Sequence, residues 1–280
     1  MKVIKNIKEM RTFSDAVRKA GKSIVFAPTM GCLHRGHVSL LEKGRGLGDV
    51  LVLSIFVNPL QFGPKEDYAS YPGDFNADLT LAEANRADVV FRPDAEEMYP
   101  GGYETHVEVE RLSRHLCGLS RPGHFRGVAT VVAKLFNIIM PDTAIFGEKD
   151  FQQLMIIKRM VQDLNIGVNI VSAPTIREPD GLALSSRNKH LNREERKAAL
   201  CLYNAIKKGK DIFESGVKDV DIILKEVKRV VEAEPLAVID YVKVCGADTL
   251  KDVDIVADKA LMAMAVRIGK ARLIDNCIVG

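Results

Sequence analysis

The 280-residue sequence has no long apolar run, no marked excess of one charge and no paired cysteine motif. Its apolar stretches fall short of the roughly 18 residues that span a bilayer. Lysine and arginine number 40 against 37 aspartates and glutamates, a formal net charge of +3. Because this excess is small, charge alone indicates neither a nucleic-acid nor a membrane partner.

The five cysteines also exclude common site types, because they are odd in number and contain no C-x-x-C pair. That pattern argues against a disulfide framework and against a zinc site. The N-terminus has neither the apolar segment nor the cleavage site of a secretory leader, so we expect a cytoplasmic protein. Apolar residues make up 47% and charged residues 28%, which suits one large or two modest globular domains.

Up to about residue 176, apolar β-branched runs alternate with helical patterns. Such runs are typical of parallel strands covered on both faces, so we predict an α/β domain over residues 1–176. We expect a helix at 8–20, capped by Thr12 or Ser14, and a short edge strand at 105–109. The other expected strands are 23–27, 49–57, 88–91, 143–146 and 168–171, and the other helices are 74–86, 128–140 and the segment ending near 163.

From residue 192 the pattern changes. Asn192 and Glu195 have the form of a capping box, and they begin a charged amphipathic segment that we expect to be one helix over 192–216. A helix at 219–232 follows, and then three alternating segments typical of antiparallel strands, at 239–244, 260–266 and 271–277. We therefore predict a smaller α+β domain over residues 177–280.

The stretch Pro-Thr-Met-Gly-Cys-Leu-His-Arg-Gly-His, residues 28–37, joins a predicted strand to a predicted helix. Parallel α/β folds bind phosphate at such junctions, because the helix N-terminus presents unpaired N–H groups. His34 and His37 would share one helix face and could donate to one polyphosphate. The pair could also be a coincidence or half of a metal site. Cys32 could be a nucleophile, but with no base assured beside it we favour a space-filling role.

Three further polar groups follow predicted strands or the domain junction. Asn58 and Gln61 would lie at the carboxyl end of a strand, where substrates bind, or be solvated loop amides. Lys149 could hold phosphate, and Asp150 could bond a ribose or cap a helix. The Ser-Ser-Arg sequence at 185–187 could form a second set of phosphate-binding groups, but it is also a common surface sequence.

Five stretches, in this order and spacing, resemble one family closely: pantothenate synthetase, the pantoate–β-alanine ligase. The stretches are 28–37, 54–62, 121–127, 146–154 and 180–188. The resemblance implies a Rossmann-like, ATP- and pantoate-binding domain and a C-terminal lid domain. It also implies a two-step reaction in which ATP adenylates the carboxylate of pantoate, pyrophosphate leaves, and the amine of β-alanine then displaces AMP.

The same resemblance implies roles for individual residues. His37 is the expected catalytic proton donor and His34 its partner. Lys149 and Arg187 are the other catalytic candidates, because they could supply positive charge around the phosphates. Gln61, Gln153 and Asn58 would bind pantoate, and Gln61 would also reach β-alanine. The expected ATP site comprises Met30, Gly31, Cys32, Leu33, His34, Arg35, Gly36, His37, Gly147, Glu148, Lys149, Asp150, Ile176, Leu184, Ser185, Ser186 and Arg187.

The family resemblance further implies a homodimer that uses ATP with Mg²⁺ and small-molecule substrates, without nucleic acid or membrane. No magnesium ligand can be assigned, although Asp78 is a candidate. The sequence departs from many members at Gly73, where arginine is usual, and at Leu184, where some have methionine. Cys32 occupies a variable position.

We consider three other functions, which differ in what happens to the bound nucleotide. A nucleotidylyltransferase acting on a phosphorylated acceptor would need additional cations where this chain has Asn58, Gln61 and Gln153. A class I aminoacyl-tRNA synthetase would need a tRNA-binding region, which the C-terminal residues do not obviously provide. A regulator would bind ATP without pyrophosphate exchange.

Overall fold

The computed structural model describes residues 1–64, 66 and 68–280, and these divide into two compact units. The first consists of Met1–Ser113, Arg121–Glu148 and Gln153–Pro174; the second consists of Arg114–Ser120, Lys149–Gln152 and Thr175–Gly280. The chain thus passes into the second unit near the boundary expected at 176/177, but two short earlier segments belong to that unit as well. Lys149 and Asp150 lie in one of these segments.

Within its described residues, the first unit contains a six-stranded sheet whose order is β1-β4-β3-β2-β5-β6. All its paired strands are parallel, so the predicted Rossmann-like fold is confirmed. The strands are β1 (Lys2–Ile4), β2 (Ile24–Thr29), β3 (Val50–Ile55), β4 (Val89–Phe91), β5 (Thr143–Gly147) and β6 (Asn169–Ala173).

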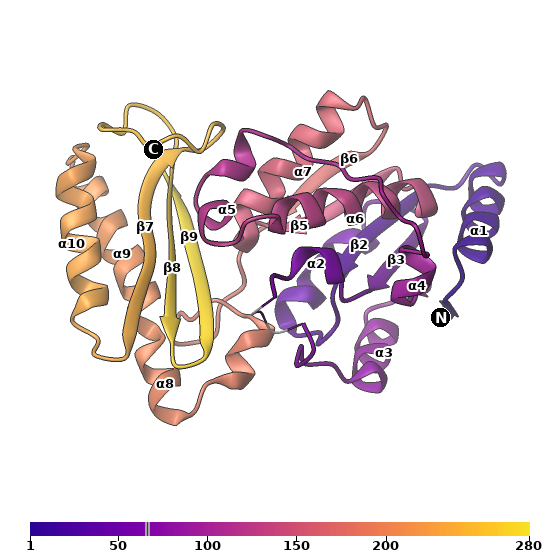
Figure 1. Cartoon of the computed structure of the whole chain (residues 1–280), viewed down its shortest axis with the longest axis horizontal. Helices are drawn as coiled ribbons and strands as arrows, with labels where there is room; N and C mark the ends of the chain where they lie inside the picture. Colours follow the sequence, from indigo (N-terminus) through magenta and orange to yellow (C-terminus); the bar gives the residue numbers. More distant parts are fainter. Residues whose placement is uncertain (65, 67) are drawn as a thin grey trace. The chain divides into compact units, whose positions relative to one another are not determined.

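Helices alternate with these strands along the chain (Figure 1). Helix α2 packs on β2, β3 and β5 and also contacts α3, while α1 contacts α6 and β2. Helix α6 is buried along most of its length, as its nearly all-apolar sequence predicts. The helices are α1 (Ile7–Lys19), α2 (Arg35–Arg45), α3 (Phe75–Ala84), α4 (Ala95–Met98), α6 (His124–Ile139) and α7 (Phe151–Asp163).

In the described part of the second unit, a three-stranded antiparallel sheet has the order β7-β8-β9. Helices α9 and α10 pack on each other and on this sheet, around a core that includes Val227, Met262 and Met264. The predicted α+β class is confirmed. The elements are α5 (Cys117–Ser120), α8 (Arg193–Ala198), α9 (Leu200–Glu214), α10 (Val220–Glu232), β7 (Ala237–Gly246), β8 (Ala260–Ile268) and β9 (Ala271–Val279).

Three local predictions were wrong, and two short elements were missed. Residues 105–109 form no strand; instead the N–H of Val107 donates to Oγ1 of Thr130 at 2.9 Å, and β1, which was not predicted, pairs with β4. The first helix is capped by Asn6, whose side chain accepts from Glu9. Residues 192–216 form two helices, because the N–H of Leu202 bonds three residues back, to Ala199, and tightens the turn. The short helix α4 was also not predicted.

Candidate active site

The signature stretch leaves the end of β2 through a tight turn before α2 begins. Gly31 has φ +86°, and a Cβ there would lie 3.0 Å from Oδ2 of Asp78, so the turn requires glycine. Cys32 follows with φ 52° and is buried, a left-handed conformation that residues other than glycine rarely adopt. The surrounding contacts must therefore hold this turn in place.

Asp78 of α3 provides those contacts. Its Oδ2 accepts the N–H of Cys32 at 2.9 Å, and its Oδ1 accepts the N–H of Leu33 at 2.6 Å. The carboxylate is only 3% exposed. Both oxygens are thus engaged by the turn, so Asp78 is a structural anchor and is not a solvated helix residue.

His34 and His37 are fixed by a capping box at the start of α2. Nδ1 of His34 accepts the N–H of Gly36 at 3.1 Å, and Nδ1 of His37 accepts the N–H of His34 at 3.3 Å. The ring centroids lie 4.1 Å apart. A neutral imidazole that accepts at Nδ1 carries its proton on Nε2. Each ring is therefore oriented to donate through Nε2–H.

Several backbone amides of the signature stretch form hydrogen bonds within the chain. The N–H of Gly31 donates to Oγ1 of Thr29 at 3.3 Å, and the N–H groups of Cys32, Leu33, His34 and Gly36 have the partners described above. Side chains of the turn and of α3 therefore order the backbone that leads into α2.

Asn58 and Gln61 lie in the turn after β3, where the short 3-10 helix η1 (Pro59–Gln61) begins. Both side chains are buried, which excludes solvated loop amides. Nδ2 of Asn58 donates to Oε1 of Gln61 at 3.1 Å, and Nε2 of Gln61 donates to Sδ of Met30 at 3.0 Å. The structure thus joins two stretches predicted separately, the signature and the loop after β3.

Helix α6 lies directly against this turn. A Cβ on Gly127 would lie 2.2 Å from the carbonyl oxygen of Leu60 and 2.6 Å from the nitrogen of Gln61, so only glycine permits the approach. The carbonyl of Gly127 also accepts from Nδ2 of Asn58 at 3.1 Å. Close backbone packing therefore fixes the position of Gln61.

A second group of side chains holds the carbonyl oxygen of Gln61. Nδ1 of His124 lies 2.8 Å from that oxygen and Nη2 of Arg121 lies 3.3 Å from it. Arg121 also pairs with both carboxylate oxygens of Glu66, at 2.6 and 2.7 Å. Burial opposes ionisation of Glu66, but the hydrogen bond and charge of Arg121 outweigh it and lower its pKa to about 2.

The signature and the segment that begins at Gly147 follow two neighbouring strands of the sheet, β2 and β5. Strand order reverses between β2 and β5, and the signature follows β2 while Gly147 ends β5. Ligands of open parallel sheets bind at such a switch point. Glu148 accepts from the hydroxyl of Ser172 at 2.7 Å, and Gln153 lies in the first turn of α7.

The remaining predicted residues lie in the second unit. Nζ of Lys149 is 3.9 Å from Oδ2 of Asp150, and the carbonyl of Lys149 accepts from Asn276 at 2.8 Å. The N–H of Leu184 donates to the carbonyl of Ile176 at 2.9 Å. Ser185 caps the 3-10 helix η4 (Ser186–His190) by accepting the N–H of Arg187 at 3.3 Å. These bonds order the predicted nucleotide segments locally.

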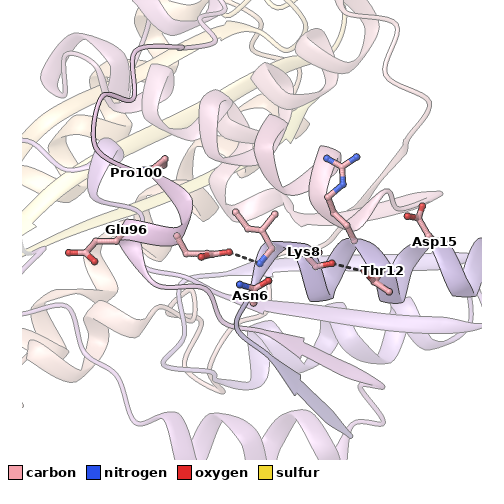
Figure 2. A pocket seen from close by; sticks show the side chains of 9 residues that line it. Asn6, Lys8, Thr12, Asp15, Glu96 and Pro100 are labelled. Atoms are coloured by element: carbon pink, nitrogen blue, oxygen red, sulfur yellow. Dashed lines mark hydrogen bonds between the residues drawn. The ribbon is translucent and has the colours of Figure 1, made fainter.

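An open pocket of about 530 Å³ lies elsewhere in the first unit, between α1 and the region of α4 (Figure 2). Glu97 of this pocket accepts the N–H of Ile7 at 2.7 Å and so already occupies the start of α1. None of the predicted site residues lines it. Its residues are Asn6, Ile7, Lys8, Arg11, Thr12, Asp15, Glu96, Glu97 and Pro100.

Among the described residues, no three histidine, cysteine, aspartate or glutamate side chains are placed to hold a metal ion. No helix in the same part of the chain is both long and apolar enough to cross a membrane.

The family model of pantoate-beta-alanine ligase matches residues 2–278. The chain belongs to this family. The pantothenate synthetase of Geobacter sulfurreducens is 52% identical over 280 residues, with all of this chain and 99% of the relative covered. That of Desulfatibacillum aliphaticivorans is 54% identical over 279 residues, with 100% and 99% covered.

Solved structures of the pantoate-beta-alanine ligase family agree. The crystal structure of pantothenate synthetase from Thermus thermophilus has a TM-score of 0.94 and 43% identity, covering 99% of each chain. The Francisella tularensis enzyme, complexed with beta-gamma ATP and beta-alanine, has a TM-score of 0.83 and 35% identity, covering 100% of this chain and 99% of that one. The resemblance stated from five short stretches is therefore confirmed over the whole chain.

Sequence reasoning missed Asp78 as an anchor, and it missed Tyr99 and Glu66 altogether. Their partners are distant in sequence. Asp78 accepts the N–H of Leu33, 45 residues away, and the hydroxyl of Tyr99 donates to Oδ1 of Asn58, 41 residues away. Nothing in the sequence of α3 indicates that the side chain of Asp78 is buried. For Glu66, the sequence shows the basic segment 121–127, but it does not show which acidic residue pairs with Arg121.

Proposed function

We propose that this chain condenses pantoate with β-alanine in two steps. The pantoate carboxylate attacks the α-phosphorus of ATP, and pyrophosphate leaves as pantoyl adenylate forms. The amine of β-alanine then attacks the acyl carbon, and AMP leaves. The observation that carries this proposal is the capping-box histidine pair at the sheet's switch point, with Gln61 against Met30 of the same stretch.

The chain's own residues supply hydrogen-bond donors and cations for the first step. Negative charge builds up on the departing pyrophosphate, and preorganised donors stabilise it most effectively. His37 donates through Nε2–H, as proton donor, and His34 stands beside it. Lys149 and Arg187 contribute positive charge. No covalent enzyme intermediate is required.

Gln61 and Gln153 hold pantoate, and Gln61 also reaches β-alanine. Asn58 belongs to the same subsite through its hydrogen bond to Gln61. Amides suit this substrate because they bond hydroxyl and carboxylate oxygens without the strong pairing that would reduce the carboxylate's nucleophilicity. The Francisella tularensis relative, with beta-alanine and a nucleotide bound, supports an assignment of both ligands to this family's fold.

The nucleotide site comprises the signature, the stretch after β5 and two segments of the second unit. The family resemblance supports this assignment. The proposed residues are Met30, Gly31, Cys32, Leu33, His34, Arg35, Gly36, His37, Gly147, Glu148, Lys149, Asp150, Ile176, Leu184, Ser185, Ser186 and Arg187.

Magnesium enters as part of the MgATP substrate. The donor set favours this view, because the two oxygens of Asp78 bind backbone amides and the described residues offer no cluster of three ligands. Mg²⁺ usually keeps several waters and binds through substrate phosphates with one or two carboxylates. No dedicated protein cage is needed.

Family resemblance supports three further assignments: a homodimer, a cytoplasmic location, and a lid role for residues 177–280 that protects the adenylate from water. Light scattering tests the dimer and cell fractionation tests the location. For the lid, energy transfer between labels on exposed positions of α1 and α10 should change when ATP and pantoate are added.

The deciding experiment is exchange of labelled pyrophosphate into ATP without β-alanine. Exchange that requires pantoate is expected, followed by AMP release when β-alanine is added. Exchange that requires a phosphorylated acceptor or an amino acid instead would favour the transferase or synthetase alternatives. ATP binding without any exchange would favour a regulator.

A further inference from the structure

The side-chain amide of Asn58 is held in one orientation by backbone groups. The N–H of Leu60 donates to its Oδ1 at 3.3 Å, and its Nδ2 donates to the carbonyl of Gly127 at 3.1 Å. A backbone N–H only donates and a carbonyl oxygen only accepts. These two contacts therefore identify the oxygen and the nitrogen of the amide, because a rotated amide would oppose donor to donor and acceptor to acceptor.

This orientation also fixes the amide of Gln61. Nδ2 of Asn58 donates to Oε1 of Gln61 at 3.1 Å, so the oxygen of Gln61 faces Asn58. The NH₂ group of Gln61 must then face the other way, where it lies 3.0 Å from Sδ of Met30. Gln61 consequently presents a donor toward the signature stretch.

Tyr99 completes the chain of hydrogen bonds. Its hydroxyl donates to Oδ1 of Asn58 at 2.8 Å, an ordinary length for an O–H···O bond. Burial, and then the neighbouring phenol of Tyr103, raise the pKa of Tyr99 well above its usual value. The hydroxyl consequently stays protonated and remains a donor at neutral pH.

We propose that Tyr99 is a positioning residue for the acid substrate: through Asn58 it holds the amide of Gln61 with its NH₂ group toward pantoate. The proposal rests on the proposed function, in which Gln61 binds pantoate. An NH₂ group at this position recognises oxygen lone pairs of a carboxylate or hydroxyl. Asn58, with both amide ends engaged, acts through Gln61.

The first test compares Tyr99→Phe with Tyr103→Phe in the pyrophosphate-exchange assay. Tyr103 is a matched control because its ring packs 5.0 Å from that of Tyr99, and its removal leaves the bond to Asn58 intact. Tyr99→Phe should raise the KM for pantoate roughly three- to tenfold, the effect of one net hydrogen bond. The KM for ATP and the melting temperature should stay close to wild type, and Tyr103→Phe should match wild type throughout.

The second test is a double-mutant cycle with Gln61→Ala. That variant alone should weaken pantoate much more than ATP. Because Tyr99 acts through Gln61, Tyr99→Phe should raise the KM for pantoate no further in the Gln61→Ala background. Additive effects, an unchanged KM in Tyr99→Phe, or an equal rise in Tyr103→Phe would each overturn the proposal. Wild-type protein that shows no pantoate-dependent exchange would instead remove the proposed function.

Discussion

The carboxylate of Asp78 accepts the backbone N–H of Leu33 at 2.6 Å, and with its other oxygen accepts that of Cys32. Through these bonds, α3 holds the left-handed turn that carries the chain into the histidine pair. A buried acidic residue on one helix thus determines the conformation of the signature on another segment.

Asp78→Asn should therefore destabilise the protein and reduce activity. An asparagine can accept only one of the two N–H groups, and its NH₂ end would face the other, which costs roughly 1–3 kcal/mol when the group is buried. Urea unfolding and kcat/KM measure the two effects. Asp74→Asn is the control, because Asp74 caps the same helix at an exposed position and asparagine caps equally well. Wild-type stability in Asp78→Asn would contradict the anchoring role.

His37→Ala should lower kcat by roughly 10²-fold or more, as the loss of one transition-state donor does. Melting temperature must be followed as well, since Nδ1 of His37 also accepts the N–H of His34. His106→Ala, at an exposed position of the same unit, is the control. An unchanged kcat would remove His37 from the catalytic role.

Gly127→Ala should destabilise the fold although alanine favours helices. The added Cβ would meet the backbone of Leu60 at 2.2 Å, and overpacking of this kind costs roughly 1–3 kcal/mol. The displaced turn should also raise the KM for pantoate. Gly101→Ala is the matched control, since nothing lies within 4 Å of a Cβ there. Equal stability of the two variants would show that α6 need not approach this turn closely.

Glu66 should contribute stability that depends on pH. Arg121 lowers its folded-state pKa to about 2 from the ordinary 4.5, so its stabilisation is complete above pH 4.5 and is lost as the pH falls toward 2. The difference in unfolding free energy between wild type and Glu66→Gln should shrink over that window, measured by urea unfolding at several pH values. Glu104→Gln, at an exposed position, should show no such trend. A constant difference would exclude the Arg121 pair as its cause.

The spacing of apolar residues predicted those strands whose side chains are buried in a regular pattern. The run at 49–57 was recognisable as the strand β3 because both of its faces are covered, and the alternation from residue 239 onward was recognisable as antiparallel strands. β1 was missed because three residues carry too little periodicity, and 105–109 was wrong because alternation cannot reveal whether a partner strand is available.

The sequence by itself determined the family, the two fold classes and the stretches that carry the histidine, amide and basic side chains, because these depend on local spacing and order. Only the tertiary structure decided what each polar group does. In the folded chain, Asp78 accepts backbone N–H groups of the signature turn, and Asn58 forms hydrogen bonds with both Tyr99 and Gln61. The physical reason is that a buried donor or acceptor without a partner costs free energy, so most of them are paired, and the partners come from segments that only folding brings together.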